Sequence, residues 1–415
     1  MLRISTSTIF DTNVSAMNQQ QASLLHTQME VSSGKRIMTP ADDPAGAAQA
    51  IEVSQSDATN TQFTTNRNAA KASLSLSEGV LQSVTTLIQN IQTTAVSAGN
   101  GTLNNTDRQT MATSLQGQLD QLIGLANSKD GSGNYLFAGS QGNTQPFVTT
   151  SAGVQYQGDT GQHLIQVASS RQMVSNANGS DLFMNVKNGN GSFVTSANSS
   201  NTGSGVISQG NLAVPPPTAA QQGNTYQLTF KITNGVSTYT VTGTDASGVP
   251  LPATSLPAAN QPYTSGQSIN FNGLQFDIQG TPASGDTFTV APSTTTSLFK
   301  TIQNLISTLN TPVPPGNPAA SATFTQQLDA AMNGLDQGLN KVLTGRATIG
   351  SNLSELDTLQ STGDALGLQY QTTLSQLQNV DFNKAISQLS QQQLGLQAAM
   401  QSFKTVSSLS LFNYM

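Results

Sequence analysis

The sequence contains no cysteine and no tryptophan, and only two histidines, among its 415 residues. Without cysteine, disulfide bonds and thiolate metal sites are excluded. The chain is long enough for about two to four domains at ~100–200 residues each. Aromatic residues make up only 5% of it, so we expect a thin hydrophobic core.

Charge is also scarce. Charged residues make up 9% of the chain, against about 25% in ordinary soluble domains. The net charge is −6 and the basic residues are scattered singly, so we expect neither nucleic acid nor an anionic membrane surface as a partner. No apolar run approaches the ~18 residues of a membrane span.

The first residues lack the basic-then-apolar layout of a cleaved signal peptide. We therefore expect a protein that stays in the cytosol or leaves by a route that reads no such signal.

No segment carries a catalytic signature. The common hydrolase, metalloprotease and phosphate-loop motifs are absent, and the glycine-rich stretch 188–193 lacks the lysine of a phosphate loop. His26 and His163 lie far apart and are read as structural or surface residues. We expect no enzyme activity, no cofactor and no metal site.

The two ends of the chain show heptad spacing. The N-terminal seam contains Val14, Met17, Gln21, Leu24, Gln28 and Val31, and the C-terminal seam contains Phe382, Ile386, Leu389, Gln393, Leu396, Met400 and Phe403. Such glutamine-containing helices are marginal alone in water. We predict that the two end segments pair with each other and fold fully only when something holds them together.

Longer helices are predicted inside these ends. One stripe runs from Leu74 to Ala98, and a second, through Ala69, Leu76, Val80 and Leu87, predicts a helix buried on two faces. Thr106 or Asp107 is expected to cap the following helix. A C-terminal heptad from Leu328 to Leu356 contains Arg346 at a position where an apolar residue is expected.

The middle of the chain has a different composition. Gly, Pro, Ser, Thr and Asn accumulate between 134 and 292, and alternating runs replace the heptads. Residues 226–243 read as two strands joined across Asn234-Gly235, a strong hairpin signal, and residues 268–280 and 285–292 read as further strands. The fold class is therefore α+β: a long helical coiled-coil rod built from both termini, with an inserted all-β domain.

Charge gathers at one place, SSGKRIMTPADDPAGAAQA (32–50). Asp43 before Pro44 favours a helix start, with a side-chain cap followed by proline at the first helical position. Lys35 and Arg36 are expected to end the preceding helix, where positive charge suits its dipole. Asp42 and Asp43 could also be paired catalytic carboxylates, but we favour the reading as a joint between helical segments.

This joint resembles the SSG-R-I-x-x-x-x-DD-x-AG-x-A segment of bacterial flagellins and their hook-associated relatives. Residues 64–84, which include Arg67, extend the resemblance, as do RATIGSNLSEL (346–356) and residues 381–415. The stretch 134–147, the block 263–292 and the ending SLSLFNYM are most similar to the hook–filament junction members of that superfamily.

The resemblance implies partners and a location. The partners are hook-associated protein 1, flagellin, further copies of the chain in a ring, a cytoplasmic export chaperone that holds about 380–415, and the flagellar type III export apparatus. The location is the extracellular flagellum, at the hook–filament junction, reached without a cleaved signal peptide.

The resemblance and the spacing together predict the domain boundaries and the roles of particular residues. Residues 1–42 and 376–415 form a terminal coiled-coil assembly core, 43–181 and 298–375 a helical rod with a short β hairpin region, and 182–297 an exposed β insertion. The expected assembly residues are Val14, Met17, Leu24, Val31, Phe382, Ile386, Leu389, Leu396, Met400 and Phe403. The expected joint is Lys35, Arg36, Asp42, Asp43 and Pro44, and Arg67 and Arg346 are expected to set alignment.

Two alternatives stay open. The chain could be a flagellin-type filament subunit, or the β insertion could house a carbohydrate-binding or enzymatic module.

Overall fold

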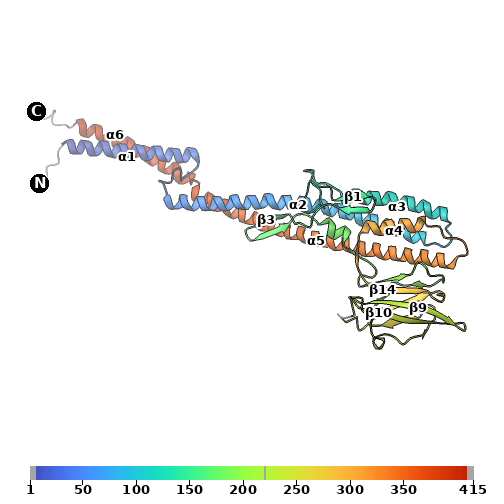
Figure 1. The fold of residues 1–415 in the computed structure, drawn as a ribbon. Helices are drawn as coiled ribbons and strands as arrows, with labels where there is room; N and C mark the ends of the chain where they lie inside the picture. The colour runs from blue at the N-terminus through green and yellow to red at the C-terminus, as the bar shows by residue number, and fades with distance from the viewer. Residues whose placement is uncertain (1–5, 219–220, 409–415) are drawn as a thin grey trace. The chain divides into compact units, whose positions relative to one another are not determined.

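The computed structural model describes residues 6–218 and 221–408. The chain divides into two compact units, residues 1–66 with 357–415 and residues 67–356. The helices are α1 (Thr6–Ser33), α2 (Pro44–Ala98), α3 (Asn105–Ala126), α4 (Leu298–Asn310), α5 (Pro318–Gln378) and α6 (Phe382–Ser408). Long helices at both ends of the chain and a central antiparallel β region confirm the predicted fold class (Figure 1).

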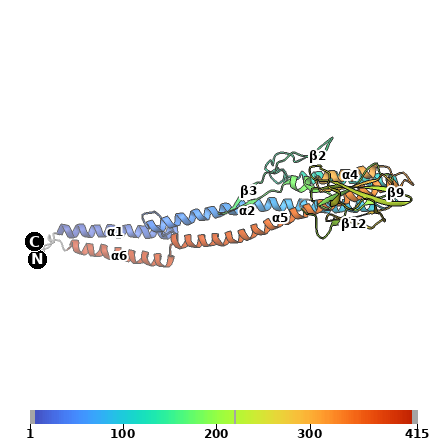
Figure 2. The same ribbon diagram turned by 60° about the horizontal axis from the view of Figure 1, so that its bottom comes forward.

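The first unit contains α1 and α6 with the adjoining stretches of α2 and α5. Helices α1 and α6 lie side by side (Figure 2). Phe10 contacts Phe403, with ring centroids 5.2 Å apart, and Phe382 lies against Gly34, so the two helices run antiparallel. The predicted pairing of the chain ends is confirmed. The C-terminal stretch LSLFNYM lies outside the described residues.

The second unit packs α3 and α4 together with α2 and α5. Helix α2 buries one main stripe, which contains Leu74, Leu81, Val84, Ile88 and Ile91. The predicted second stripe is wrong in its first half, because Leu76 is 41% exposed and Ala69 is also exposed. In its second half, by contrast, Val80 is half-buried and Leu87 is buried.

The cap of α3 also differs from the prediction. Asn104 caps the helix, and its side chain accepts from the Asp107 backbone N–H while Asp107 bonds back to the Asn104 N–H. Asp107 is therefore the N3 residue of a capping box that begins at Asn104.

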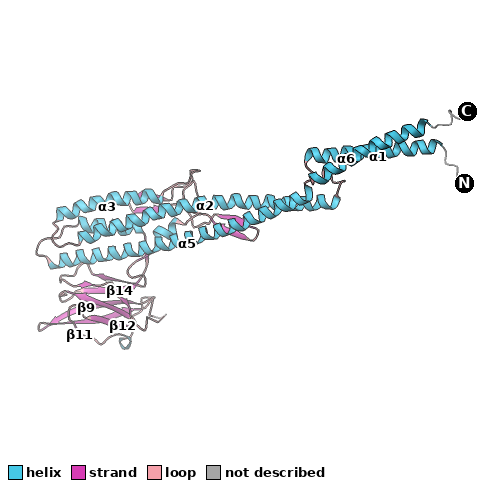
Figure 3. Ribbon diagram, turned by 180° about the vertical axis from the view of Figure 1, so that it is seen from behind, coloured by secondary structure: helices cyan, strands magenta, loops and turns pink. Residues whose placement is uncertain are grey.

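Three short β pairings accompany these helices (Figure 3). They are β1 (Phe147–Thr150) with β2 (Gly153–Tyr156), β3 (Leu164–Ala168) with β4 (Arg171–Val174), and β5 (Val186–Lys187) with β15 (Thr295–Thr296). A π-helical turn, η1 (Ser180–Met184), precedes β5. Phe137, Phe147, Phe183 and Phe299 form a buried aromatic cluster at this level.

The β insertion contains two antiparallel sheets (Figure 3). One has the order β11-β10-β9-β14-β6, and in the other β12, β7 and β8 pair with β13. The strands are β6 (Phe193–Ala197), β7 (Val206–Ile207), β8 (Asn211–Leu212), β9 (Thr225–Thr233), β10 (Val236–Thr244), β11 (Gln261–Pro262), β12 (Ser268–Phe271), β13 (Leu274–Gln279) and β14 (Thr287–Pro292), with a short 3-10 turn, η2 (Ala253–Ser255).

Local turn chemistry fixes the register of this insertion. Asn234 and Gly235 both have positive φ, 53° and 78°, and join β9 to β10 with Thr233 opposite Val236. A two-residue turn of this kind matches the twist of the strands, so the predicted hairpin is confirmed. A buried apolar core that includes Tyr226 and Phe288 lies between the sheets.

Candidate functional site: the joint and the terminal helix pair

The joint begins where α1 ends. Gly34 has φ 69°, in the left-handed region that glycine adopts without steric cost. The segment from Gly34 to Arg36 then pairs with the segment between α5 and α6: the Val380 N–H donates to Gly34 O (3.0 Å) and the Arg36 N–H to Gln378 O (2.7 Å). Residues more than 340 positions apart are thus held together by backbone hydrogen bonds.

Arg36 reinforces this connection with its side chain. Its Nη2 donates to Leu377 O (2.9 Å) and its Nη1 to the Asp43 carboxylate (3.2 Å). The prediction that Lys35 and Arg36 end the preceding helix is wrong, because α1 ends at Ser33. Both residues lie in the paired segment instead, where the backbone of Lys35 forms an antiparallel β-bridge with that of Asn379.

Asp42 closes the turn inside the joint. Its carboxylate accepts from the backbone N–H groups of Met38 (3.0 Å) and Thr39 (2.7 Å), and lies 3.1 Å from His26 Nε2. These hydrogen bonds, the Thr39 N–H first and His26 next, lower the pKa of Asp42 from 3.8 to about 2. The other ring nitrogen of His26 lies 3.5 Å from Glu30. His26 therefore links α1 to the joint, a role that the sequence did not indicate.

Asp43 starts α2. Its Oδ1 accepts from the Gly46 N–H (2.9 Å), as expected for a side-chain cap before Pro44. This hydrogen bond and the Arg36 guanidinium lower the pKa of Asp43. A Cβ atom at Gly46 would lie 2.5 Å from Asp43 Oδ2 and 2.9 Å from Ile37 Cδ1, so a larger residue there would displace both side chains.

The terminal helix pair has a narrow seam. Its inner side includes seven of the ten expected assembly residues, all half-buried: Val14, Met17, Leu24, Val31, Leu389, Leu396 and Phe403. The most buried members are Thr27 (4%) and Ala385 (3%), which the heptad reading omitted.

The polar members of the seam also differ from the heptad reading. Gln21 and Gln28 are exposed, and Gln20 lies against Gly395 instead.

The other three expected assembly residues remain outside the seam. Phe382, Ile386 and Met400 are 51%, 50% and 45% exposed. Large apolar side chains of α1 are exposed as well, among them Phe10 (51%) and Leu25 (52%). The single subunit therefore buries only part of the apolar surface of its terminal helices.

The two alignment residues lie in the second unit. Arg67 is 3% exposed, and its Nη1 donates to Val167 O in β3 (2.9 Å). Arg346 Nη2 and Nε donate to the Glu78 carboxylate (2.8 and 3.0 Å), and its Nη1 lies 3.3 Å from Thr85 Oγ1. Arg67 fastens a hairpin to α2, and Arg346 joins α5 to α2.

Within residues 6–218 and 221–408, no group of three or more His, Asp or Glu side chains is placed to hold a metal ion. In that same part of the chain, no helix is both long and apolar enough to cross a membrane.

Comparison with known proteins gives consistent matches. Residues 4–142 match the family model described as the bacterial flagellin N-terminal helical region. The chain is 32% identical to flagellar hook-associated protein 3 of Salmonella typhimurium and 30% identical to that of Escherichia coli, each over 411 residues that cover 99% of this chain and 99% of the relative.

Solved structures agree. The crystal structure of flagellar hook-associated protein 3 from Legionella pneumophila matches with a TM-score of 0.71 and 29% identity, over 78% of this chain and 98% of that one. A crystal structure of Xanthomonas campestris FlgL matches with a TM-score of 0.69 and 29% identity, over 78% of this chain and 99% of that one.

Proposed function

Because the chain belongs to the flagellar hook-associated protein 3 family, we propose that this flagellar structural protein is the adaptor of the hook–filament junction. Copies of it form a ring between hook-associated protein 1 and the first turn of flagellin, and the ring templates filament growth. The observation that carries this proposal is the apolar surface that α1 and α6 leave exposed after they have paired.

The exposed apolar residues lie on one side of the helix pair. At 3.6 residues per turn, Phe382, Ile386 and Met400 lie about 45–85° round α6 from the mean direction of its seam residues. Phe10 and Leu25 lie about 45–105° round α1 from its seam residues, in the same rotational sense. In an antiparallel pair, equal rotational senses bring residues to the same side, so these five side chains form one face, here called the outer flank.

The outer flank suits contacts between subunits. A heterologous contact that repeats around an axis builds rings or helical arrays. With few charges nearby, the flank supplies apolar contact whose strength depends weakly on salt. A helix pair with a thin seam is marginal alone and gains its order on assembly.

We assign the domains and the remaining partners on the same basis. Residues 1–42 and 376–415 form the assembly core, 43–181 with 298–375 the supporting helical region, and 182–297 the surface insertion. An export chaperone covers about 380–415 before the type III apparatus exports the chain without a cleaved signal, and the ring assembles outside the cell. No catalytic step is assigned.

The proposal is tested with a deletion strain and two matched variants. Deletion of the gene is expected to abolish swimming and to release unpolymerised flagellin into the medium. Ile386→Ser removes an outer-flank contact, whereas Leu389→Ser removes a seam contact on the same helix.

The two variants separate assembly from folding. Ile386→Ser is expected to leave the stability of the free subunit unchanged and to reduce the number of filaments several-fold, while Leu389→Ser lowers helix protection in the free subunit. Normal long filaments in the deletion strain, or filaments formed by the purified protein alone, would contradict the adaptor function.

A further inference from the structure

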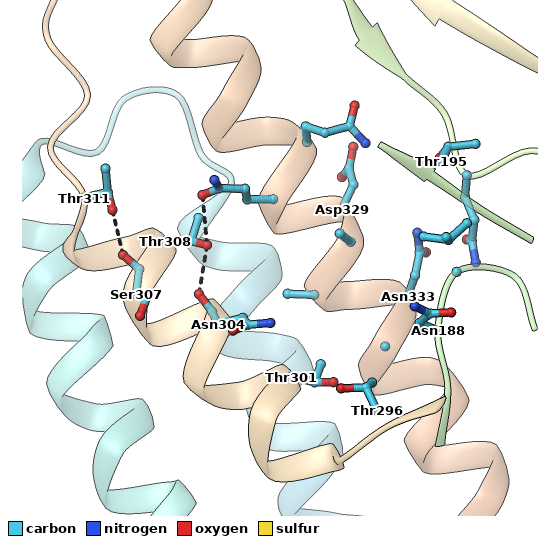
Figure 4. A pocket seen from close by; sticks show the side chains of 18 residues that line it. Asn188, Thr195, Thr296, Thr301, Asn304, Ser307, Thr308, Thr311, Asp329 and Asn333 are labelled. Carbon is cyan, nitrogen blue, oxygen red and sulfur yellow. Dashed lines mark hydrogen bonds between the residues drawn. The ribbon is translucent and has the colours of Figure 1, made fainter. Parts of the chain in front are cut away.

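A groove of about 480 Å³ lies among α4, α5 and the β insertion in the second unit (Figure 4). Asn, Gln, Ser and Thr side chains dominate its walls, and Asp329 is the only charged residue among the lining residues, which include no aromatic ring. Its volume is within the ~300–1,000 Å³ that small-molecule sites occupy.

Part of this lining is already hydrogen-bonded within the protein. Thr308 Oγ1 lies 3.2 Å from Gln327 Oε1 and donates to Asn304 O (2.9 Å). Gln326 Oε1 accepts from the Ile207 N–H of β7 (2.9 Å), and Thr195 Oγ1 donates to Ser208 O (2.8 Å). These contacts join the helices to the β insertion and fix the shape of the groove.

Six polar side chains of the lining make no side-chain hydrogen bond or ion pair with the described part of the chain: Gln209, Thr296, Asn304, Ser307, Asp329 and Asn333. Three of them, Asn304 of α4 and Asp329 and Asn333 of α5, are amides or carboxylates that lie on two neighbouring helices. Asp329 and Asn333 are four residues apart and share one face of α5, and Figure 4 places Asn304 on the neighbouring helix. The groove thus presents two amides and one carboxylate that are free to bind a ligand.

We propose that this groove binds an uncharged hexose, either free or as the terminal sugar of a longer glycan. Each amide offers a donor and an acceptor side by side, which matches the neighbouring hydroxyl groups of a sugar ring. The carboxylate accepts from a further hydroxyl. Because the lining has no Lys, Arg or His, we expect phosphorylated and acidic sugars to bind more weakly than neutral ones.

The environment of the carboxylate supports this assignment. Partial desolvation by the groove walls raises the pKa of Asp329. Asp329 and Asn304 are exposed and Asn333 is half-buried, so a sugar reaches the groove from solvent and its hydrogen bonds replace hydrogen bonds to water. With no aromatic ring to stack on the sugar, we expect a dissociation constant on the order of millimolar.

The site differs from the one that the sequence suggested. A carbohydrate-binding module was considered within residues 182–297, whereas the two amides and the carboxylate proposed here to hold the sugar belong to α4 and α5. The test therefore uses the full-length chain.

Saturation-transfer NMR of the purified full-length protein tests the proposal with glucose, galactose and N-acetylglucosamine, each free and at the end of a tetrasaccharide. We expect saturable binding of at least one free sugar. Glucose 6-phosphate is expected to bind at least tenfold more weakly than glucose. If only the tetrasaccharide binds, the terminal sugar of a glycan is the ligand.

Matched variants locate the binding site. Asn333→Ala and Asn304→Ala are expected to weaken binding at least fivefold, while Asn340→Ala, on α5 but outside the groove, leaves it unchanged. Ser307→Trp places a bulky group in the groove from the exposed side of α4 and is expected to abolish binding without unfolding the chain. No saturable binding by any of these sugars, or equal binding by the wild type and Ser307→Trp, would overturn the proposal.

Discussion

Adjacent carboxylates in the joint have different tasks. Asp42 holds a turn by accepting two backbone N–H groups, and Asp43 caps α2 and pairs with Arg36. The paired-carboxylate pattern that could suggest catalysis is thus fully occupied by structural hydrogen bonds. Two adjacent ionised groups are possible here because each has its own donors.

Asp42 predicts an acid sensitivity of the joint. Its pKa of about 2 in the folded joint is below its ordinary value of 3.8, so the ionised carboxylate stabilises the joint above about pH 4. This contribution is lost as the pH falls through about 2. Pepsin cleavage within residues 34–43 measures it.

Asp42→Asn cannot titrate and serves as the reference. The ratio of its cleavage rate to that of the wild type is expected to exceed one at pH 4 and to approach one near pH 2. A ratio that stays constant over this range would contradict the assignment.

The close contacts around Gly46 predict that a larger residue at this position destabilises the joint. Gly46→Ala places a methyl group against Asp43 and Ile37 and is expected to destabilise the joint by about 1–3 kcal/mol. Gly79→Ala in the same helix meets no atom within 4 Å and is expected to stabilise by about 0.5–1 kcal/mol. Hydrogen exchange over residues 34–58 and 75–85 measures both, and equal effects of the two substitutions would exclude the steric account.

At the scale of elements, the β3–β4 hairpin is fastened to both long helices of the second unit. Arg67 of α2 donates to Val167 O in β3. Arg171 of β4 makes a two-bond pair with Glu355 of α5 (2.6 and 2.8 Å). The hairpin therefore connects α2 and α5 through two independent anchors of different strength.

Removal of each anchor is expected to lower the protection of the β3–β4 hairpin from hydrogen exchange by a different amount. Arg171→Ala is expected to raise hydrogen exchange in residues 164–174 only slightly, since its ion pair is half-exposed and screened. Arg67→Met leaves the Val167 carbonyl without its donor and is expected to cost about 1–3 kcal/mol and to expose the same segment. Equal exchange in the two variants would contradict this ranking.

Elements that depend on neighbouring residues could be predicted from the sequence, and long-range contacts could not. The Asn234-Gly235 turn and the Asp43-Pro44 helix start depend on adjacent residues. The Arg36 contact with Leu377 joins residues 341 positions apart, and the His26 contact with Asp42 depends on the turn that brings α1 back to the joint.

The seam of the terminal pair shows the same limit. Heptad spacing could not choose between Gln20 and Gln21, because both are polar. Gly395 on the partner helix places Gln20 in the seam, because the missing side chain of the glycine leaves room for it.

At the scale of the whole molecule, stability is expected to be uneven. The second unit has the large buried cores, whereas the terminal pair has a half-buried seam with Gln20 and Thr27 in it. Local opening free energies follow such differences in burial. The two units are therefore expected to differ in protection from hydrogen exchange.

Hydrogen exchange on the free subunit measures this difference. Residues 6–33 and 382–408 are expected to exchange far faster than α3, α4 and the central stretch of α2. Addition of partner proteins is expected to slow the exchange of these two segments. Strong protection of both segments in the isolated subunit would contradict the proposal that assembly completes them.

The pairing of the first helix with the last delays folding during synthesis. Roughly 350 residues separate Ser33 from Phe382, and a ribosome at ~5–20 residues per second needs about 20–70 s to translate them. Throughout that interval α1 exists without α6, and its apolar stripe is open to other nascent chains. The first helix can therefore meet its partner helix only after the whole chain has been translated.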